Sequence, residues 1–115
     1  MIDCGADILF GHGPHVTRAL ELYKERIICY SLGNFLTYGR FKINGPNGYS
    51  PVVTVQTDIT GKFIAGNIIP VYQDSNGKVR IDPQKRVIRK IRELTAADFP
   101  EGGIVISESG RINKN

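Results

Sequence analysis

Residues 6–16 of the chain are ADILFGHGPHV, a stretch that joins an apolar run to both histidines of the protein. The run Ala6–Phe10 ends at Gly11, a pattern typical of a buried strand followed by a loop. His12 and His15 lie in that loop, just past the end of the strand. Open α/β sheets bind their ligands at this position, so the loop is the first candidate for a functional site.

Two interpretations of the histidine loop remain open. Neutral imidazoles are good ligands for Zn, Mn or Fe, and Gly11 and Gly13 would let the backbone approach a bound group. Pro14 stiffens the loop, which reduces the ordering that binding requires. Alternatively, both histidines are polar residues of a turn, because a metal site needs at least three ligands and this loop supplies two.

The rest of the sequence predicts mostly strands. Residues 18–23 predict a short strand or one helical turn, and RIICYSLGNFL (residues 26–36) predicts a second buried strand that ends near Gly33 and Asn34. Asn34 either orients a ligand or the histidine loop, or caps a turn. Residues 37–50 are rich in Gly, Asn and Pro and predict a loop. The segments at 51–59 and 62–73 predict a β-hairpin, and the turn DSNGK is followed by a short strand, VRI, that pairs back.

One helix is predicted late in the chain. Asp82 is a candidate N-cap and Pro83 suits the first helical position. The helix ends before Phe99, and its apolar face carries Val87, Ile88, Ile91 and Leu94. The segment GGIVIS then predicts a last strand. The tail ESGRINKN either extends this strand or is frayed. Strands and a helix in this order predict an α/β or α+β fold.

Basic residues are concentrated on this helix, where Lys85, Arg86, Arg89 and Lys90 lie mostly opposite the apolar face. A solvated outer face is the simpler interpretation. The functional alternative is a surface that binds an anionic polymer such as polyglutamate, with an affinity that falls steeply with salt. The net charge of +4 permits an anionic partner without requiring one, and we expect no nucleic-acid partner.

Composition predicts one domain over residues 1–115. No apolar run approaches the roughly 20 residues that a membrane-spanning helix requires, and no leader pattern follows Met1. Cys4 and Cys29 are too few for a disulfide framework, so we expect two buried free thiols.

Two quoted segments, GADILFGHGPHV and ELYKERIICYSLGNFL, together resemble the C-terminal part of the poly-gamma-glutamate capsule biosynthesis protein CapA family. That family is related to the calcineurin-like metallophosphoesterases, and its members carry a G-H-x-P-H-V loop followed by a strand that ends in Y-S-L-G-N-F. The later strands, basic helix and glycine-led strand also fit. The resemblance implies the C-terminal part of a metallophosphoesterase-like β-sandwich flanked by helices.

The resemblance also implies a role for the histidines. In the superfamily, the G-H-x-H element is the last of several metal motifs and its histidines ligate a two-metal centre of Mn, Zn or Fe. The superfamily spaces these histidines by one residue, whereas His12 and His15 are spaced by two. Gly13 occupies a position that often holds a second histidine, which makes His15 the stronger ligand candidate.

The earlier metal motifs of the superfamily, D-x-H, G-D and G-N-H, do not occur in this sequence. We therefore expect the chain to correspond to the final portion of a larger domain, to pair with the missing N-terminal part or with itself, and to lack appreciable phosphatase activity alone. The resemblance implies a divalent metal in the full-length protein and leaves open that this chain by itself binds none. Relatives suggest work at the bacterial envelope. The rival hypothesis is a non-catalytic binding or assembly module for an anionic polymer.

Overall fold

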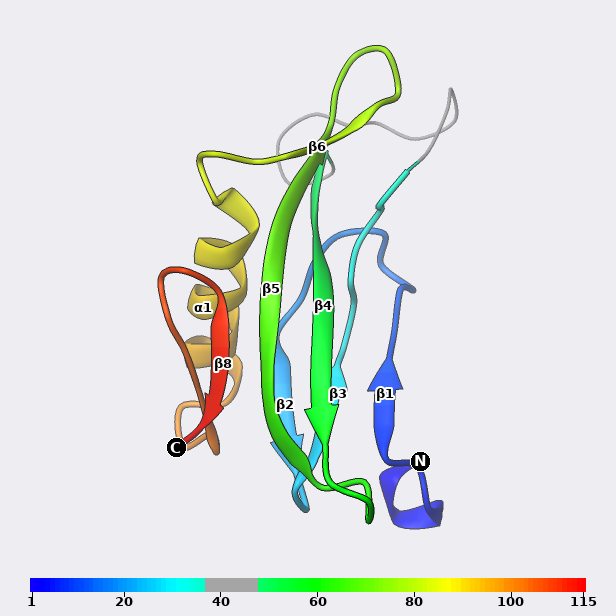
Figure 1. Ribbon diagram of the computed structural model, residues 1–115, viewed down its shortest axis with the longest axis vertical. Coiled ribbons are helices and arrows are strands. Elements are labelled where there is room, and N and C mark those ends of the chain that lie inside the picture. The colour runs from blue at the N-terminus through cyan, green and yellow to red at the C-terminus, as the bar shows by residue number, and fades with distance from the viewer. Residues whose placement is uncertain (37–47) are drawn as a thin grey trace.

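The computed structural model describes residues 1–36 and 48–115 and shows a mixed α/β fold with two sheets, mostly strands and one α-helix (Figure 1). The predicted fold class is confirmed in these terms. The predicted loop at residues 37–47 lies outside the described residues. The elements in chain order are η1 (Ile2–Cys4), β1 (Ile8–Phe10), β2 (Leu20–Tyr23), β3 (Arg26–Cys29), β4 (Tyr49–Thr57), β5 (Phe63–Gln73), β6 (Val79–Ile81), α1 (Arg86–Asp98), β7 (Ile104–Ile106) and β8 (Arg111–Lys114).

The smaller sheet has the strand order β1-β3-β2. β2 and β3 form an antiparallel hairpin whose turn, Lys24-Glu25, has positive φ at both residues, which matches the right-handed twist of the strands. β1 pairs parallel to β3, from Ile8 opposite Ile27 to Phe10 opposite Cys29. The chain between β1 and β2 must therefore cross over the end of β3, and this crossover contains the histidine loop.

The larger sheet has the order β4-β5-β8-β7, with β6 added to β5. β4 and β5 form the long hairpin that the sequence predicted, and β6 pairs back on β5 as expected. Two predictions were wrong here. Tyr49 and Ser50 belong to β4 rather than to the preceding loop, and the tail forms a separate strand, β8, which lies between β5 and β7.

Three hairpin turns in this sheet share one local design. Each turn starts with a residue that carries a side-chain oxygen, has glycine three positions later and a basic residue after that, as in DITGK, DSNGK and SESGR. In each, the glycine amide donates to the carbonyl of the first residue at 3.0 Å. The side chain of the first residue, whether Asp58, Asp74 or Ser107, accepts the amide of the basic residue. Each turn therefore closes with contacts inside five residues.

Helix α1 begins later than predicted. Pro83 lies in a turn, not at the first helical position, and the backbone at Lys85 is left-handed with φ 53°. Asp82 still serves the helix start, because its carboxylate accepts the amide of Arg86, the first helical residue, at 3.2 Å. The helix ends at Asp98, as expected. It is too short to cross a membrane, and no helix among the described residues is long and apolar enough to do so.

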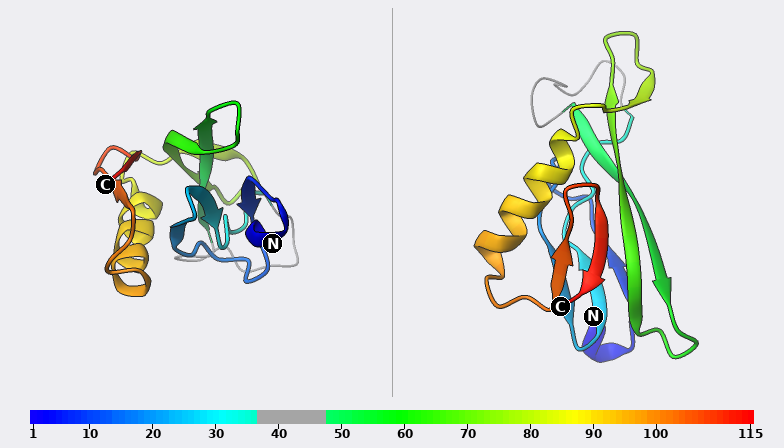
Figure 2. Two further views of the ribbon diagram at one scale, coloured as in Figure 1. Left: turned by 90° about the horizontal axis from the view of Figure 1, so that it is seen from below. Right: turned by 60° about the vertical axis from the view of Figure 1, so that its left-hand side comes forward.

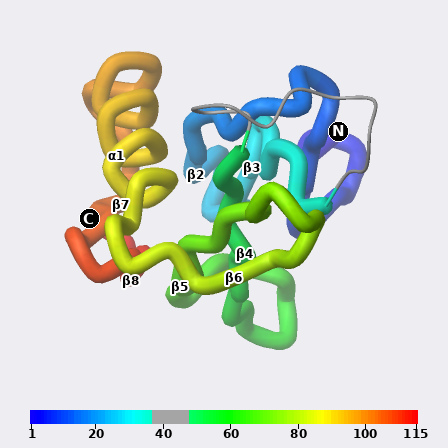
Figure 3. Tube along the Cα trace, turned by 90° about the horizontal axis from the view of Figure 1, so that it is seen from above, coloured from blue at the N-terminus to red at the C-terminus, as the bar shows by residue number. Residues whose placement is uncertain are grey.

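The core lies between the larger sheet and a second layer made of α1 and the smaller sheet (Figures 2 and 3). The predicted apolar face of α1 is buried at Val87, Ile88 and Ile91, while Leu94 is half-buried and Thr95 takes the remaining buried position. Eleven buried side chains form one cluster: Leu20, Ile27, Cys29, Phe63, Ile68, Val87, Ile88, Ile91, Ile104, Ile106 and Ile112.

Strand β1 is less buried than the sequence predicted. It lies at the outer edge of the smaller sheet, with Ile8 38% and Phe10 47% exposed, whereas the central strand β3 is buried as expected. The cysteine prediction was half right. Cys29 is buried, and burial raises its pKa to about 12, but Cys4 is exposed. Cys29 is therefore a protonated core residue at neutral pH.

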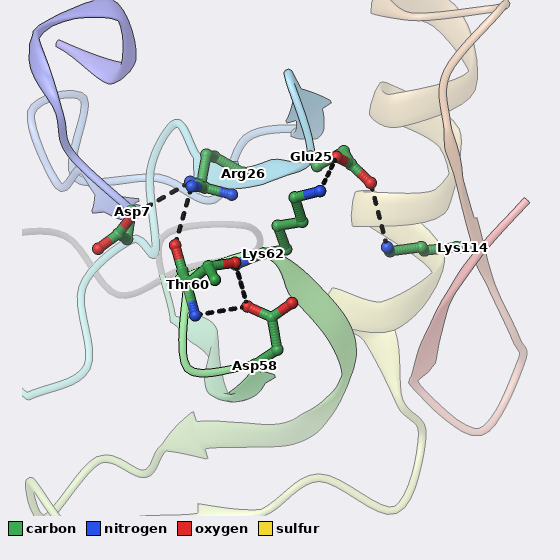
Figure 4. A network of polar contacts seen from close by, with 7 residues as sticks. All are labelled: Asp7, Glu25, Arg26, Asp58, Thr60, Lys62 and Lys114. Atoms are coloured by element: carbon green, nitrogen blue, oxygen red, sulfur yellow. Dashed lines mark hydrogen bonds and ion pairs between the residues drawn. The ribbon is translucent and has the colours of Figure 1, made fainter.

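Polar contacts at one end of the molecule join the two sheets (Figure 4). The guanidinium of Arg26 in β3 donates to the carbonyl of Thr60, in the β4–β5 turn, at 2.9 Å. The carboxylate of Glu25 lies between Lys62 of the larger sheet, at 3.1 Å, and Lys114 of β8, at 3.6 Å. The side chains of Glu25, Lys62 and Lys114 are about half exposed, so each ion pair contributes little to stability. Together these contacts connect the turn of the smaller sheet to the larger sheet.

Candidate functional site

The histidine loop is fixed at its first residue by backbone pairing to the end of β3. Gly11 donates its amide to the carbonyl of Cys29 and accepts the amide of Leu32, each at 2.8 Å. A Cβ at Gly11 would collide with the carbonyl oxygen of Tyr30. Glycine at this position therefore permits close contact with β3, whereas a Cβ at Gly13 would meet open space. A substrate-contacting role for either glycine stays a prediction.

His12 and His15 lie at the two ends of one β-turn, because the amide of His15 donates to the carbonyl of His12 at 3.0 Å. The turn keeps their Cα atoms within about 7 Å of each other. Both side chains are exposed, and His15 has a left-handed backbone with φ 60°. The two-residue spacing thus keeps the two Cα atoms close, since the turn brings the chain back on itself between them.

The end of the second motif, Y-S-L-G-N-F, packs directly against this turn. The carbonyl oxygen of Gly33 lies 3.5 Å from Nδ1 of His12, at the outer limit for a hydrogen bond. Metal-binding histidines commonly donate one ring N–H to a backbone carbonyl, which directs the other nitrogen outward. Asn34 follows as a half-buried residue. The structure therefore brings the two motifs together at His12.

Thr17 packs against the same segment, at Leu32 and Gly33. It forms a bridge to Leu32, and its hydroxyl lies close to Gly33, where a Cβ would approach Oγ1 within 2.8 Å. The hydroxyl of Thr17 is buried and has no hydrogen-bond partner in the described part of the chain. Gly33 has φ 73°, a conformation that glycine adopts without strain.

An open groove of about 650 Å³ adjoins the histidine loop and was not foreseen from the sequence. Pro14 of the loop, Arg18 and the stacked rings of Tyr30 and Phe99 line it, with ring centroids 5.7 Å apart. Asp98 completes the polar rim. Arg18 follows the first motif closely and Tyr30 is the first residue of Y-S-L-G-N-F, but their proximity depends on the crossover of the chain over β3, which no local pattern indicates.

The position of Tyr30 in the groove is stabilised by a hydrogen bond to Glu21. The hydroxyl of Tyr30 donates to a carboxylate oxygen of Glu21 at 2.6 Å, and this bond raises the pKa of Tyr30 to about 12. The phenol is therefore protonated at neutral pH and contributes an aromatic wall rather than a charge.

The residues present fit only part of a metal site. Among residues 1–36 and 48–115, no three side chains of His, Cys, Asp or Glu lie close enough together to hold an ion. Two exposed imidazoles on one turn suit Zn, Mn or Fe by ligand type, but they leave at least one further ligand to be supplied from elsewhere.

The four basic residues predicted to bind a polyanion differ in their surroundings. Lys85 is exposed and Lys90 half-buried, while the guanidinium of Arg89 donates to the carbonyl of Gln84. Arg86 is ion-paired to buried Asp82, with 2.9 Å between Nε and Oδ2. Its side chain is therefore engaged within the fold, and Lys85, Arg89 and Lys90 are better placed for an external anion.

The comparisons with known proteins match the segment that contains the histidine turn. Residues 1–38 match the protein family described as bacterial capsule synthesis protein PGA_cap. This segment runs from η1 through β3 to the Y-S-L-G-N-F motif. The N-terminal third of the chain is therefore similar to the bacterial capsule synthesis family, which supports the resemblance to CapA over that segment.

Three relatives illustrate the match. The chain is similar to the capsule biosynthesis protein CapA of Bacillus anthracis, with 58% identity over 36 residues, 31% of this chain and 9% of that protein. It is 63% identical over 35 residues to the uncharacterized protein y4sH of Sinorhizobium fredii (strain NBRC 101917 / NGR234), covering 30% of the chain and 8% of that protein. The PGA biosynthesis protein CapA of Bacillus subtilis (strain 168) is 56% identical over 36 residues, 31% of the chain and 10% of that protein. The matched stretch thus covers a tenth or less of each relative.

Proposed function

We propose that the chain is a segment of a capsule biosynthesis protein of metallophosphoesterase-like fold and that its histidine turn supplies the last metal ligands of the site. The observation that supports this most directly is the β-turn that places both imidazoles, exposed, at the ends of a single hydrogen bond of 3.0 Å. The domain assignment of residues 1–115 as one fragment-like unit belongs to the same proposal.

The fold explains why such a turn would be a good ligand pair. Gly11 donates its amide to Cys29 at the end of β3 and accepts the amide of Leu32 just beyond that strand, and the carbonyl of Gly33 lies next to His12. The imidazoles are therefore carried by backbone that is already ordered, which reduces the entropy lost on binding. A divalent ion bound there would act as a Lewis acid toward a phosphoryl oxygen and would lower the pKa of a bound water.

Arg18 and the groove beside it extend this proposal. The groove begins at Pro14, inside the histidine turn, and its lining includes Arg18 and the two stacked rings of Tyr30 and Phe99. A planar guanidinium pairs well with phosphate or carboxylate oxygens. In the proposed function, Arg18 holds an anionic group of the substrate next to the ion, and Asn34 orients the histidine turn.

Zinc titration of the chain, followed by the imidazole resonances in NMR spectra, tests the proposal without an activity assay. Because the exposed thiol of Cys4 would also bind zinc, the reference protein is the Cys4→Ser variant. We expect both histidines to shift together with one saturable ion, and His15→Ala or His12→Ala to weaken binding at least tenfold. Independent shifts of the two rings, or zinc binding that survives both substitutions, would contradict the proposal.

The second candidate is a module that binds an anionic polymer, and the exposed Lys85 and Arg89 support it. Binding of polyglutamate by metal-free protein, lost in a Lys85→Glu, Arg89→Glu variant and weakened by salt, would favour it. If the histidine variants bind polyglutamate normally while zinc binding is lost, the two functions are separate.

A further inference from the structure

We propose that the free edge of β7, together with the groove between β7 and α1, binds an extended acidic peptide segment of a partner protein by strand addition. This site lies in the C-terminal half of the chain and does not depend on the histidine turn. Strand addition requires three features at one place: unpaired backbone groups, a groove for alternate side chains, and a chemical preference.

The unpaired backbone groups follow from the register of β7 and β8. The amide of Asn115 donates to the carbonyl of Gly103 at 2.8 Å, so this pair is hydrogen-bonded. Bonded and non-bonded pairs alternate in antiparallel ladders, so Val105 is bonded to β8 while the amides and carbonyls of Ile104 and Ile106 point away from it. In the described part of the chain, β7 has no strand partner other than β8. These two residues, 9% and 8% exposed, therefore direct their backbone donors and acceptors away from β8, on the side of β7 where they line the groove.

The groove lies along this edge. In the right-hand view of Figure 2, β7 lies between β8 and α1. The groove has a volume of about 540 Å³, and both Ile104 and Ile106 line it. Ala96, Phe99 and Pro100 form its apolar part, near the end of α1. An added strand would place every second side chain in this groove and the others in solvent.

The charges of the groove indicate an acidic occupant. Arg89 and Arg92 line the groove, and Glu93 is the single acidic side chain among its lining residues. Arg92 lies 3.8 Å from Glu108, whose side chain is 91% exposed, so this ion pair is loose. A second copy of the chain paired through the same edge would bring the arginines of both copies together. Charge complementarity therefore favours an acidic peptide over self-association.

The amides of Ile104 and Ile106 provide a direct test. The chain, labelled with ¹⁵N, is titrated with the acetylated and amidated octapeptide Glu-Val-Glu-Thr-Glu-Val-Glu-Thr, and hydrogen exchange is followed by residue. At saturation we expect exchange at Ile104 and Ile106 to slow at least tenfold. Exchange at Val105, which is already bonded to β8, should change much less. The version of the peptide with Lys in place of Glu should bind at least tenfold more weakly.

Two variants provide matched controls on the same helix. Arg92→Glu reverses a charge that lines the groove and should weaken binding of the acidic peptide about tenfold, equivalent to about 1.4 kcal/mol. Lys90→Glu makes the same change at a position outside the groove lining and should change affinity less than twofold. Circular dichroism of each variant establishes that the fold is retained.

Four results would overturn the proposal. The first is unprotected Ile104 and Ile106 amides at saturating peptide. The second is equal loss of affinity in the two variants, which would indicate a diffuse polyanion surface. The third is slower exchange at Ile104 and Ile106 when the concentration of the chain is raised without peptide, which would identify the occupant as a second copy of the chain. The fourth is equal protection by a γ-linked glutamate oligomer, whose backbone spacing differs from that of an α-peptide strand.

Discussion

The contact between Asp82 and Arg86 gives the sharpest prediction about stability, because it joins α1 to the larger sheet. The side chain of Asp82 is 1% exposed, and its carboxylate accepts the amide of Gln84 at 3.0 Å and Nε of Arg86 at 2.9 Å. The guanidinium of Arg86 lies over two rings, with 5.4 Å to the centroid of Tyr49 and 5.6 Å to that of Tyr72. Replacing Arg86 by alanine therefore removes one ionic and two aromatic contacts.

The expected loss can be built from these contacts. Removing one partner of a fully buried ion pair costs roughly 3–5 kcal/mol, but Arg86 is partly exposed and backbone amides continue to bind the carboxylate, so we expect about 2 kcal/mol here. Each cation–π contact adds about 0.5 kcal/mol at a partly exposed site. The sum, about 3 kcal/mol, corresponds to a decrease in Tm on the order of 10 °C. Asp82→Ala also removes the carboxylate that accepts the amides of Gln84 and Arg86 and should cost about 2–3 kcal/mol.

Urea unfolding followed by circular dichroism measures these changes, and a double-mutant cycle isolates the pair. We expect the double variant to lose about 1–2 kcal/mol less than the sum of the single variants, because both remove the same contact. Lys85→Ala is the control, since it changes an exposed neighbour without this contact and should stay within about 0.5 kcal/mol. Strict additivity, or an Arg86→Ala protein as stable as the parent, would refute the reasoning.

The same pair predicts a dependence on pH. Burial acts to raise the pKa of Asp82, but hydrogen bonds from the side chain and amide of Arg86 and from the amide of Gln84 outweigh it, so the pKa is lowered. A lowered folded-state pKa stabilises the fold above the unfolded value of about 3.9. That contribution is lost as pH falls through the folded value. The stability difference between the parent and Asp82→Ala should therefore be constant near neutral pH and shrink in acid; a difference that grew in acid would contradict this assignment.

Three further predictions address other contacts. Gly110→Ala should destabilise the fold by more than 2 kcal/mol, because φ is 97° and a Cβ would collide with the carbonyl of Ile68. Gly77→Ala should cost only about 1 kcal/mol, because φ is 79° but a Cβ would meet nothing closer than Nε2 of Gln73 at 4.0 Å. Urea unfolding of the two variants compares these costs. Thr95→Val should cost about 1–3 kcal/mol, because the hydroxyl of Thr95 accepts the buried amide of Leu20 at 3.1 Å, and hydrogen exchange at Leu20 should accelerate. The purified chain should not hydrolyse p-nitrophenyl phosphate with Mn²⁺ or Zn²⁺, because residues 1–36 and 48–115 bring no three ligand side chains together. Robust metal-dependent turnover would show that the chain alone forms a complete site.

The sequence predicted the hairpins well because their signals are local. Alternating apolar residues and the turn chemistry of DITGK and DSNGK determine where β4, β5 and β6 begin and end. SESGR follows the same pattern with serine in place of aspartate, so β8 could have been found by comparing the three turns. The helix start was misplaced because Asp82-Pro83 resembles a cap, while the fold uses the carboxylate to hold Arg86 four residues later.

The candidate site was only partly predictable. The histidines and the Y-S-L-G-N-F motif could be identified from sequence, and so could their position after strands. Their mutual contact, the groove at Arg18 and the exposure of β1 depend on the crossover and on the parallel pairing with β3. Such pairing joins segments about twenty residues apart, and periodicity does not reveal which strands become neighbours.

The parallel placement of β1 has a consequence for the order of folding. Each hairpin can close by itself within microseconds, because its strands are adjacent in the chain. β1 has no such neighbour and can only dock once β3 is already formed, with the crossover closed over it. We expect the imidazoles to acquire their final orientation only after β3 has formed, so that a ligand of the turn would distinguish molecules in which β1 has docked from those in which it has not.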